Sequence, residues 1–333
     1  MRRKLFHIVA AVSIVAAGMF SAVQAGVVSF GSGSNQFHME FVTIGNPGNL
    51  ADTDALAQPL NAGAVGYTYG IGKFEVSRDM IAKFNASQSL QISLADMSDN
   101  GGNGTNKPAT GVSWNEAARF VNWLNTNTGN HVAYKFTTNG VNDDIALWVS
   151  GEAGYDSSNP YRNSLAKYVL PSSNEWYKAA YYNPNDSLYY DFPNGLNIAP
   201  TAVASSTADN TAVYFQTLEQ GPADVDKAGG LSPYGVMGLG GNAWEWEESF
   251  HDVLNIGVFS HRGIRGGLWV NGSATLSSSI RARLVPSLEN AFIGFRVASL
   301  SSSAPPTVPE PSMMVIGTLF GLGGLVAKRR MKK

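Results

Sequence analysis

The stretch GLGGNAWEWEES (residues 238–249) joins a glycine-rich turn to two tryptophans and three glutamates. Three interpretations of it are open: a loop that cradles a phosphate, a pair of catalytic acids, or a turn held by a metal ion. Each interpretation makes a different demand on the neighbouring sequence, so the surrounding chain can distinguish them.

The phosphate interpretation rests on glycine spacing. Gly238, Gly240 and Ala243 match the pattern G-x-G-x-x-A of dinucleotide-binding proteins. That pattern has to follow a strand and open a helix, with an acidic residue about 20 positions further on. No helical apolar period continues after Trp244, so the sequence disfavours a dinucleotide site.

The acid-pair interpretation depends on strand geometry. On a β-strand Glu245 and Glu247 share one face, and Trp244 and Trp246 share the other. Two carboxylates about 5–10 Å apart can hydrolyse a glycosidic bond. Nothing in the sequence indicates a cleft, so we expect a half-buried strand with a solvated glutamate face and keep glycosidase chemistry as the alternative.

Other catalytic patterns are missing from the sequence. The chain contains no cysteine, which excludes thiolate zinc sites and thiol catalysis. The histidines beyond the first 25 residues do not form an H-E-x-x-H pattern, and no G-x-S-x-G is present; they are His38, His131, His251 and His261. The acidic segments DTD (52–54) and DVDKAGG (224–230) lack the ligand spacing of an EF-hand.

The first 25 residues predict a secretory signal peptide. Arg2, Arg3 and Lys4 precede an apolar run over residues 8–20, and small side chains lead to a cleavage site after Ala25. The predicted domain therefore begins at residue 26 and extends to residue 300, and the protein is predicted to be exported.

The C-terminal end predicts an anchor. Residues 301–308 have the composition of a linker, and Pro309, Glu310 and Pro311 then precede an apolar run over 313–327 and five basic residues. The run is short for a transmembrane helix, which needs about 20 residues, and basic residues stay cytoplasmic. Residues 309–333 therefore predict a short C-terminal transmembrane helix.

The two ends distort the charge balance. Three of the 23 basic residues lie in the signal peptide and five in the tail, and Glu310 is one of the 25 acidic residues. The middle of the chain thus carries 15 basic and 24 acidic residues, a net charge of about −9. Such a surface has no basic patch for nucleic acid, so we expect no nucleic-acid partner.

Three segments predict helices with capped starts. Ser77 precedes an apolar face, and Ser113 and Ser172 each stand three residues before a glutamate, the capping-box pattern. Residues 38–45 and 67–76 alternate as strands do. Most other segments are rich in Gly, Asn, Ser and Thr, so the sequence predicts an α+β domain with few helices, short strands and much irregular structure.

The order of the segments resembles the formylglycine-generating enzyme (sulfatase-modifying factor) family. The resemblance is carried by YGIGKFEVSRDMIAKF (69–84), KPATGVSWNEAARFVNWLN (107–125), YVLPSSNEWYKAAYYNP (168–184), SPYGVMGLGGNAWEWEES (232–249), RGIRGGLWVNG (262–272) and IGFRVAS (293–299). It implies a C-type-lectin-like fold for residues 26–300.

The resemblance also implies where catalysis would reside. Active members oxidise a sulfatase cysteine with copper held by two cysteines after the Arg-Gly-Gly segment. Asn271 and Leu276 fall at those positions here. Copper(I) prefers thiolates, so we expect no copper and no cysteine-dependent oxidase chemistry.

The resemblance further implies structural calcium beside the tryptophan motif. Its ligands would be the carbonyl groups of Gly241 and Ala243 and the carboxylate of Glu245, with a side chain at position 238. Gly238 has no side chain that could supply an oxygen ligand, and this weakens a calcium site that needs six to eight oxygens. The alternative is a metal-free turn in which Glu245 accepts hydrogen bonds from backbone amides.

The tail is similar to the PEP-CTERM sorting signals of Gram-negative bacteria. Pro309, Glu310 and Pro311, an apolar helix and an arginine-rich tip occur in that order. The similarity implies an exosortase-type processing partner, transient anchoring in the inner membrane, and delivery to the outer cell surface or the extracellular matrix.

Two functions are therefore open. The first is an exported, non-catalytic binding or structural module whose partner is an extracellular polysaccharide or a surface protein. The second is an enzyme on the same fold with cysteine-independent chemistry. A deep polar pocket near Trp269, Asn271 and Arg281 would favour the enzyme, and a filled or flat surface there would favour the binding module.

Overall fold

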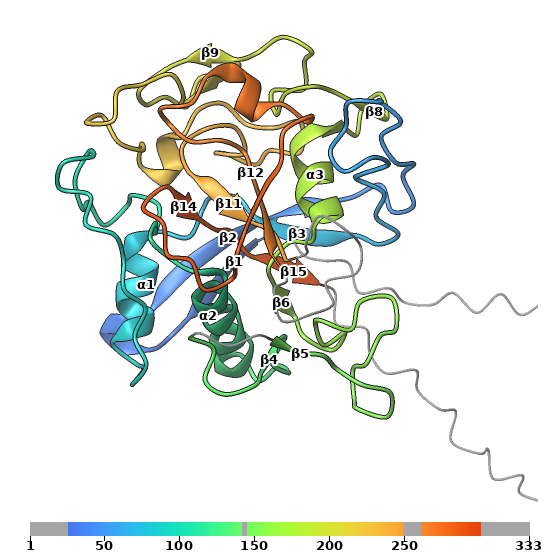
Figure 1. Ribbon diagram of the computed structural model, residues 1–333, viewed down its shortest axis with the longest axis vertical. Coiled ribbons are helices and arrows are strands. Elements are labelled where there is room, and N and C mark those ends of the chain that lie inside the picture. Colours follow the sequence, from blue (N-terminus) through green and yellow to red (C-terminus); the bar gives the residue numbers. More distant parts are fainter. Residues whose placement is uncertain (1–25, 142–144, 249–260, 301–333) are drawn as a thin grey trace, which may run out of the picture. The chain divides into compact units, whose positions relative to one another are not determined.

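The computed structural model describes residues 26–141, 145–248 and 261–300 (Figure 1). The predicted signal peptide with Ala25, the linker, and the tail with Pro309, Glu310 and Pro311 lie outside the described residues. Within the described ranges, no helix is both long enough and apolar enough to cross a membrane.

The three predicted helices are confirmed. They are α1 (Arg78–Asn85), α2 (Trp114–Asn127) and α3 (Ser173–Tyr181). The side chain of Ser77 caps α1, and Ser113 and Ser172 form complete capping boxes with Glu116 and Glu175. Three short 3-10 helices are η1 (Gly33–Asn35), η2 (Val225–Lys227) and η3 (Ser273–Leu276).

The larger sheet joins the two ends of the domain. Its strands run in the order β1 (Gly26–Phe30), β2 (Phe37–Ile44), β3 (Tyr69–Gly72), β15 (Ala298–Leu300) and β6 (Tyr168–Val169). Every neighbouring pair is antiparallel. The expected strand 38–45 corresponds to β2, whereas the expected strand 67–76 is reduced to β3.

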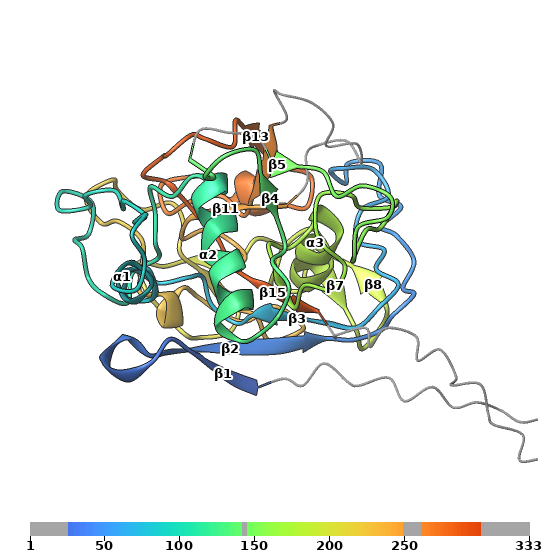
Figure 2. The same ribbon diagram turned by 90° about the horizontal axis from the view of Figure 1, so that it is seen from below.

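Helix α2 packs on the inner side of the β1–β2 ribbon (Figure 2). The ring of Phe37 on β2 stacks on Phe120 and Trp123 of α2, with ring centroids 6.1 and 5.8 Å apart. Phe120 also meets the edge of Phe295, which lies close to β15. These contacts bind the first strands, the second helix and the end of the domain into one apolar core.

The tryptophan motif forms the middle of a second sheet. The order is β13 (Ala282–Leu284), β12 (Arg262–Arg265), β11 (Trp244–Trp246) and β14 (Ile293–Gly294). Strand β11 is antiparallel to β12 and parallel to β14. Because β11 has a neighbour on each side, the motif lies inside the domain rather than at an edge.

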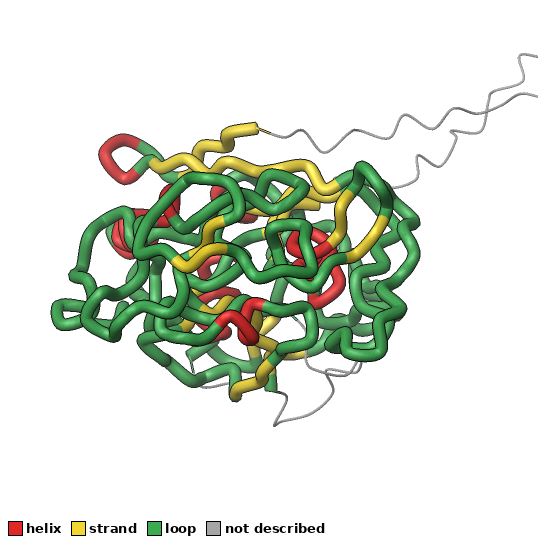
Figure 3. Tube along the Cα trace, turned by 90° about the horizontal axis from the view of Figure 1, so that it is seen from above, coloured by secondary structure: helices red, strands yellow, loops and turns green. Residues whose placement is uncertain are grey.

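Short strand pairs and loops make up the remainder. The pairs are β4 (Lys135–Phe136) with β5 (Ile145–Ala146), β7 (Tyr182–Asn183) with β8 (Leu188–Tyr189), and β9 (Thr201–Ala202) with β10 (Thr211–Ala212). Figure 3 shows how much of the described chain is loop. The predicted α+β class, with few helices, short strands and much irregular structure, is confirmed.

Candidate functional site

The glycines of residues 238–241 make a tight turn before β11. Gly238 and Gly241 have φ values of +76° and +83°, a region that side chains disfavour. A Cβ at Gly241 would overlap the carbonyl oxygen of Val213. Backbone conformation and close packing therefore explain these glycines, and no phosphate is needed to account for them.

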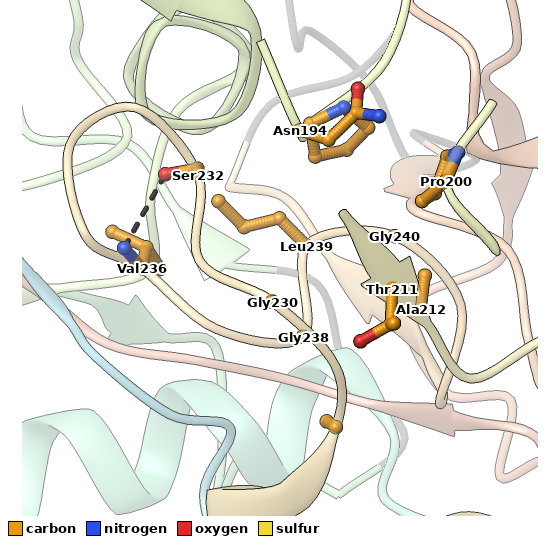
Figure 4. A pocket seen from close by; sticks show the side chains of 12 residues that line it. Asn194, Pro200, Thr211, Ala212, Gly230, Ser232, Val236, Gly238, Leu239 and Gly240 are labelled. Carbon is orange, nitrogen blue, oxygen red and sulfur yellow. Dashed lines mark hydrogen bonds between the residues drawn. The ribbon is translucent and has the colours of Figure 1, made fainter. Parts of the chain in front are cut away.

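The space beside Gly238 is largely filled. A Cβ there would lie 3.4 Å from the Glu75 carboxylate oxygen Oε2 and 3.4 Å from Ala228 Cβ. The adjoining cavity has a volume of about 10 Å³, which is room for about one water molecule (Figure 4). Within the loop that borders it, the Val236 amide donates to Ser232 Oγ over 3.3 Å.

Glu245 is held by an arginine from the end of the domain. Arg296 donates from Nε to Oε2 over 2.6 Å and from Nη2 to Oε1 over 2.5 Å. The indole of Trp176 in α3 donates to Oε2 over 2.7 Å. Both oxygens of Glu245 thus accept strong hydrogen bonds in a bidentate ion pair.

Glu247 binds two arginines. Arg265 Nε donates to Oε1 over 3.1 Å and Arg281 Nε donates to Oε2 over 2.6 Å, and all three side chains are fully buried. Burial opposes ionisation, yet the two guanidinium groups hold the pKa of Glu247 below its usual value. Glu247 is therefore a carboxylate at neutral pH.

Glu248 belongs to a third buried network. It accepts hydrogen bonds from Tyr134 Oη (2.8 Å), Asn159 Nδ2 (2.7 Å) and Arg162 Nη1 (3.4 Å). Arg162 also binds Glu175, the capping residue of α3, with Nη2 2.9 Å from Oε1. Burial, together with the charge of Glu175, raises the pKa of Glu248.

The expectation of a solvated glutamate face is wrong. Glu245 and Glu247 are 0% exposed and Glu248 is 1% exposed. Alternation along the strand places the tryptophans opposite the glutamates, but arginines from other segments cover the glutamate face. Because the oxygens of Glu245 and Glu247 already accept guanidinium hydrogen bonds, the pair has no room to act on a glycoside between them.

The residues around Glu245 do not fit the calcium site that the resemblance implies. A divalent ion on Glu245 would stand beside the Arg296 guanidinium and compete for the same oxygens. Gly238 contributes no side chain. In the described ranges, no group of three or more His, Asp or Glu side chains is arranged to hold a metal ion.

The metal-free alternative also needs correction, since the Arg296 guanidinium and the Trp176 indole, rather than backbone amides, donate hydrogen bonds to Glu245.

The two positions expected for copper ligands have other roles. Asn271 Oδ1 accepts a hydrogen bond from the Leu268 amide over 3.1 Å and so closes its own turn. Leu276 is fully buried in an apolar cluster with Ala212 and Tyr214. Neither side chain lines the cavity beside Gly238 or the cavity beside β2.

Trp269, Asn271 and Arg281 have separate contacts in the described part of the chain. Trp269 is buried against Phe292, with ring centroids 5.5 Å apart, whereas Arg281 binds Glu247. Neither the cavity beside Gly238 nor the cavity of about 230 Å³ beside β2 is lined by any of the three residues. The polar pocket that would favour an enzyme is therefore not formed by these three residues at either cavity.

Sequence reasoning missed Glu75, which lies close to the turn. Its Oε2 accepts from Asn242 Nδ2 over 2.6 Å, and its Oε1 has no hydrogen-bond partner among the described residues. Burial raises the pKa of Glu75 to about 8, and the charge of Glu245 adds to the rise. The sequence predicts its segment, KFEV (73–76), only as part of a strand. A single acidic residue within an apolar strand pattern was the signal that could have pointed to Glu75.

Residues 18–300 match the model of the sulfatase-modifying factor enzyme 1-like domain family, also called FGE-sulfatase. The chain belongs to this family. No curated protein is detectably similar in sequence.

Among the solved structures that share the fold of this FGE-family chain are three with TM-scores above 0.5. Treponema denticola variable protein 1 has a TM-score of 0.55 at 18% identity, covering 82% of this chain and 98% of that one. CarF has a TM-score of 0.55 at 20% identity, covering 78% and 98%. PvdO from Pseudomonas aeruginosa has a TM-score of 0.51 at 15% identity, covering 82% and 97%. At these identities the likeness concerns the fold alone.

Proposed function

We propose that this FGE-family protein is an exported, non-catalytic binding module of the cell surface or the extracellular polysaccharide matrix. The observation that carries the proposal is that the side chains at the two expected copper positions have structural roles. Asn271 uses its side chain to close a turn, and Leu276 packs in an apolar cluster.

The chemistry of those side chains agrees with the proposal. Copper(I) is held by soft thiolates and thioethers, and an amide and an aliphatic group do not replace them. The chain has no cysteine elsewhere that could take over. The family's copper-dependent oxidation therefore has no donor set in this chain.

The two ends of the sequence support the export part of the proposal. A signal peptide cleaved after Ala25 would carry the chain across the inner membrane, where the helix within residues 309–333 would hold it transiently. An exosortase-type enzyme would then process the tail near Pro309–Pro311. Detection of the protein on intact Gram-negative cells with and without an exosortase tests this route, and equal surface amounts would contradict it.

The non-catalytic part is tested by metal content and turnover. Full-length protein is exposed to copper and iron salts, desalted, and assayed for metal and for oxidation of a cysteine-containing sulfatase peptide. A copper-loaded formylglycine-generating enzyme serves as the control. We expect no stoichiometric metal and no formylglycine. One equivalent of retained copper or iron, or any turnover, would overturn the proposal.

A further inference from the structure

Phe215 is a strained aromatic residue on the surface. Six non-glycine residues in the described ranges have a positive φ, and all but Phe215 are short polar residues: Asn46, Asn61, Ser187, Asn210 and Asn242. Phe215 has φ +56° and is 75% exposed. Asparagine tolerates this region, whereas a bulky side chain there is an outlier.

The strained conformation is imposed by the core beneath it. The Phe215 amide donates to the Asn271 carbonyl over 2.9 Å, and the Gln216 amide donates to the Trp269 carbonyl over 2.8 Å. Trp269 is fully buried. Glycine or asparagine at position 215 would keep these backbone bonds without strain. The phenyl ring therefore costs stability and, being exposed, adds little packing, which indicates a role outside the fold.

Residues 214–221, here called the Phe215 loop, are held to neighbouring segments by hydrogen bonds. The Leu218 carbonyl accepts hydrogen bonds from Trp269 Nε1 (3.3 Å) and Asn100 Nδ2 (3.1 Å), which hold the middle of the loop. Leu218 itself is 45% exposed. The other exposed side chains of the loop are Thr217, Glu219 and Gln220.

We propose that the Phe215 loop binds a neutral polysaccharide, with the Phe215 ring stacked on the apolar face of a sugar. This proposal rests on the proposed binding function and names its ligand class. An aromatic ring offers a flat, electron-rich face to C–H groups. Two exposed polar side chains of the same loop, Thr217 and Gln220, can exchange hydrogen bonds with sugar hydroxyls.

Charge and composition favour a neutral sugar over other partners. The loop YFQTLEQG has no basic residue and carries Glu219. Hydrogen bonds from its own amide and from Thr217 lower the pKa of Glu219, so its charge repels anionic polysaccharides. A protein interface needs an apolar centre of several side chains, whereas the large apolar side chains that this loop exposes are those of Phe215 and Leu218.

The test uses the full-length chain in a detergent without a sugar headgroup. The probes are dextran, laminarin, mannan and galactan as neutral polymers, and alginate as an anionic one, in affinity electrophoresis. We expect retardation by at least one neutral polymer and none by alginate. Retardation by alginate alone, or by no polymer, would overturn the ligand class while leaving the non-catalytic assignment to its own metal and turnover test.

Variants at position 215 test the residue itself. Phe215→Gly should weaken binding at least tenfold, and Phe215→Trp should retain it. Phe215→Gly should also unfold at no lower urea concentration than the wild type, which separates lost binding from lost folding. Tyr155→Ala, at another exposed aromatic residue, is the matched control and should bind like the wild type. Unchanged polysaccharide binding by Phe215→Gly would contradict the proposal. So would a wild-type dimer that Phe215→Gly abolishes, because the ring would then bind a second copy of the chain.

Discussion

The acidic residues of the tryptophan motif are stabilised by arginines that are distant in sequence. Glu245 binds Arg296, 51 residues away, and Glu247 binds Arg281, 34 residues away. Arginine suits these buried positions because its planar group forms two parallel hydrogen bonds and stays charged. A buried carboxylate that lost such a partner would be strongly destabilising.

Glu75 is a buried acid close to Glu245, and its Oε2 accepts a hydrogen bond from Asn242 rather than from an arginine. Its pKa rises to about 8 because it is buried and lies near Glu245. The folded protein therefore holds a proton that the unfolded chain releases at lower pH, and stability falls as pH rises from about 4.5 to about 8.

We expect Glu75→Gln to remove this pH dependence. Between about pH 5 and pH 8 the wild type should lose unfolding free energy relative to the variant, by up to about 1.4 kcal/mol per pH unit. Urea unfolding at a series of pH values measures it, with Glu40→Gln at a partly exposed ion pair as the control. Parallel curves for the wild type and Glu75→Gln would show that Glu75 is ionised throughout.

At the residue scale, the sequence predicted which faces of β11 differ but not what covers them. Alternation separates Glu245 and Glu247 from the tryptophans. It carries no information about Arg265, Arg281 and Arg296, which reach the strand only after the chain has folded. The solvated face was the reasonable expectation for an isolated strand, and long-range pairing made it wrong.

At the scale of elements, the starts of the helices were predictable because a capping box is local. Ser113 accepts from the Glu116 amide over 3.2 Å, and the Glu116 carboxylate accepts from the Ser113 amide over 2.9 Å. Two-residue strands such as β6 and β14 were not predictable, because so short a segment has no period. Their pairing depends on β15 and β11, which lie far away in sequence.

We expect Ser113→Ala to destabilise the protein by about 1 kcal/mol, the usual value of an N-cap. The loss arises because the Glu116 amide and the first turn of α2 lose their acceptor. Ser113→Thr keeps the hydroxyl and should retain most of the stability. Urea midpoints of the two variants against the wild type measure the effect, and equal losses in both would point to packing rather than capping.

At the scale of the whole domain, Arg296 joins segments that are far apart in sequence. Besides Glu245 on β11, it donates to the carbonyl of Gly72 at the end of β3 and to that of Met237 before the turn, each over 2.9 Å. The order of the segments resembled the family and so predicted the fold. The role of Arg296 as a shared contact required the three-dimensional structure.

The most direct test of the structural role of Glu245 is a double-mutant cycle with Arg296. Urea unfolding is measured for the wild type, Glu245→Gln, Arg296→Met and the double variant, in EGTA and in about 1 mM calcium, a concentration that fills extracellular sites. We expect each single change to cost about 3–5 kcal/mol. The double variant should cost less than their sum by up to about 3 kcal/mol, equally with and without calcium. Additive losses would contradict an ion pair between Glu245 and Arg296. A calcium-dependent gain in stability that Glu245→Gln abolishes would favour a metal site instead.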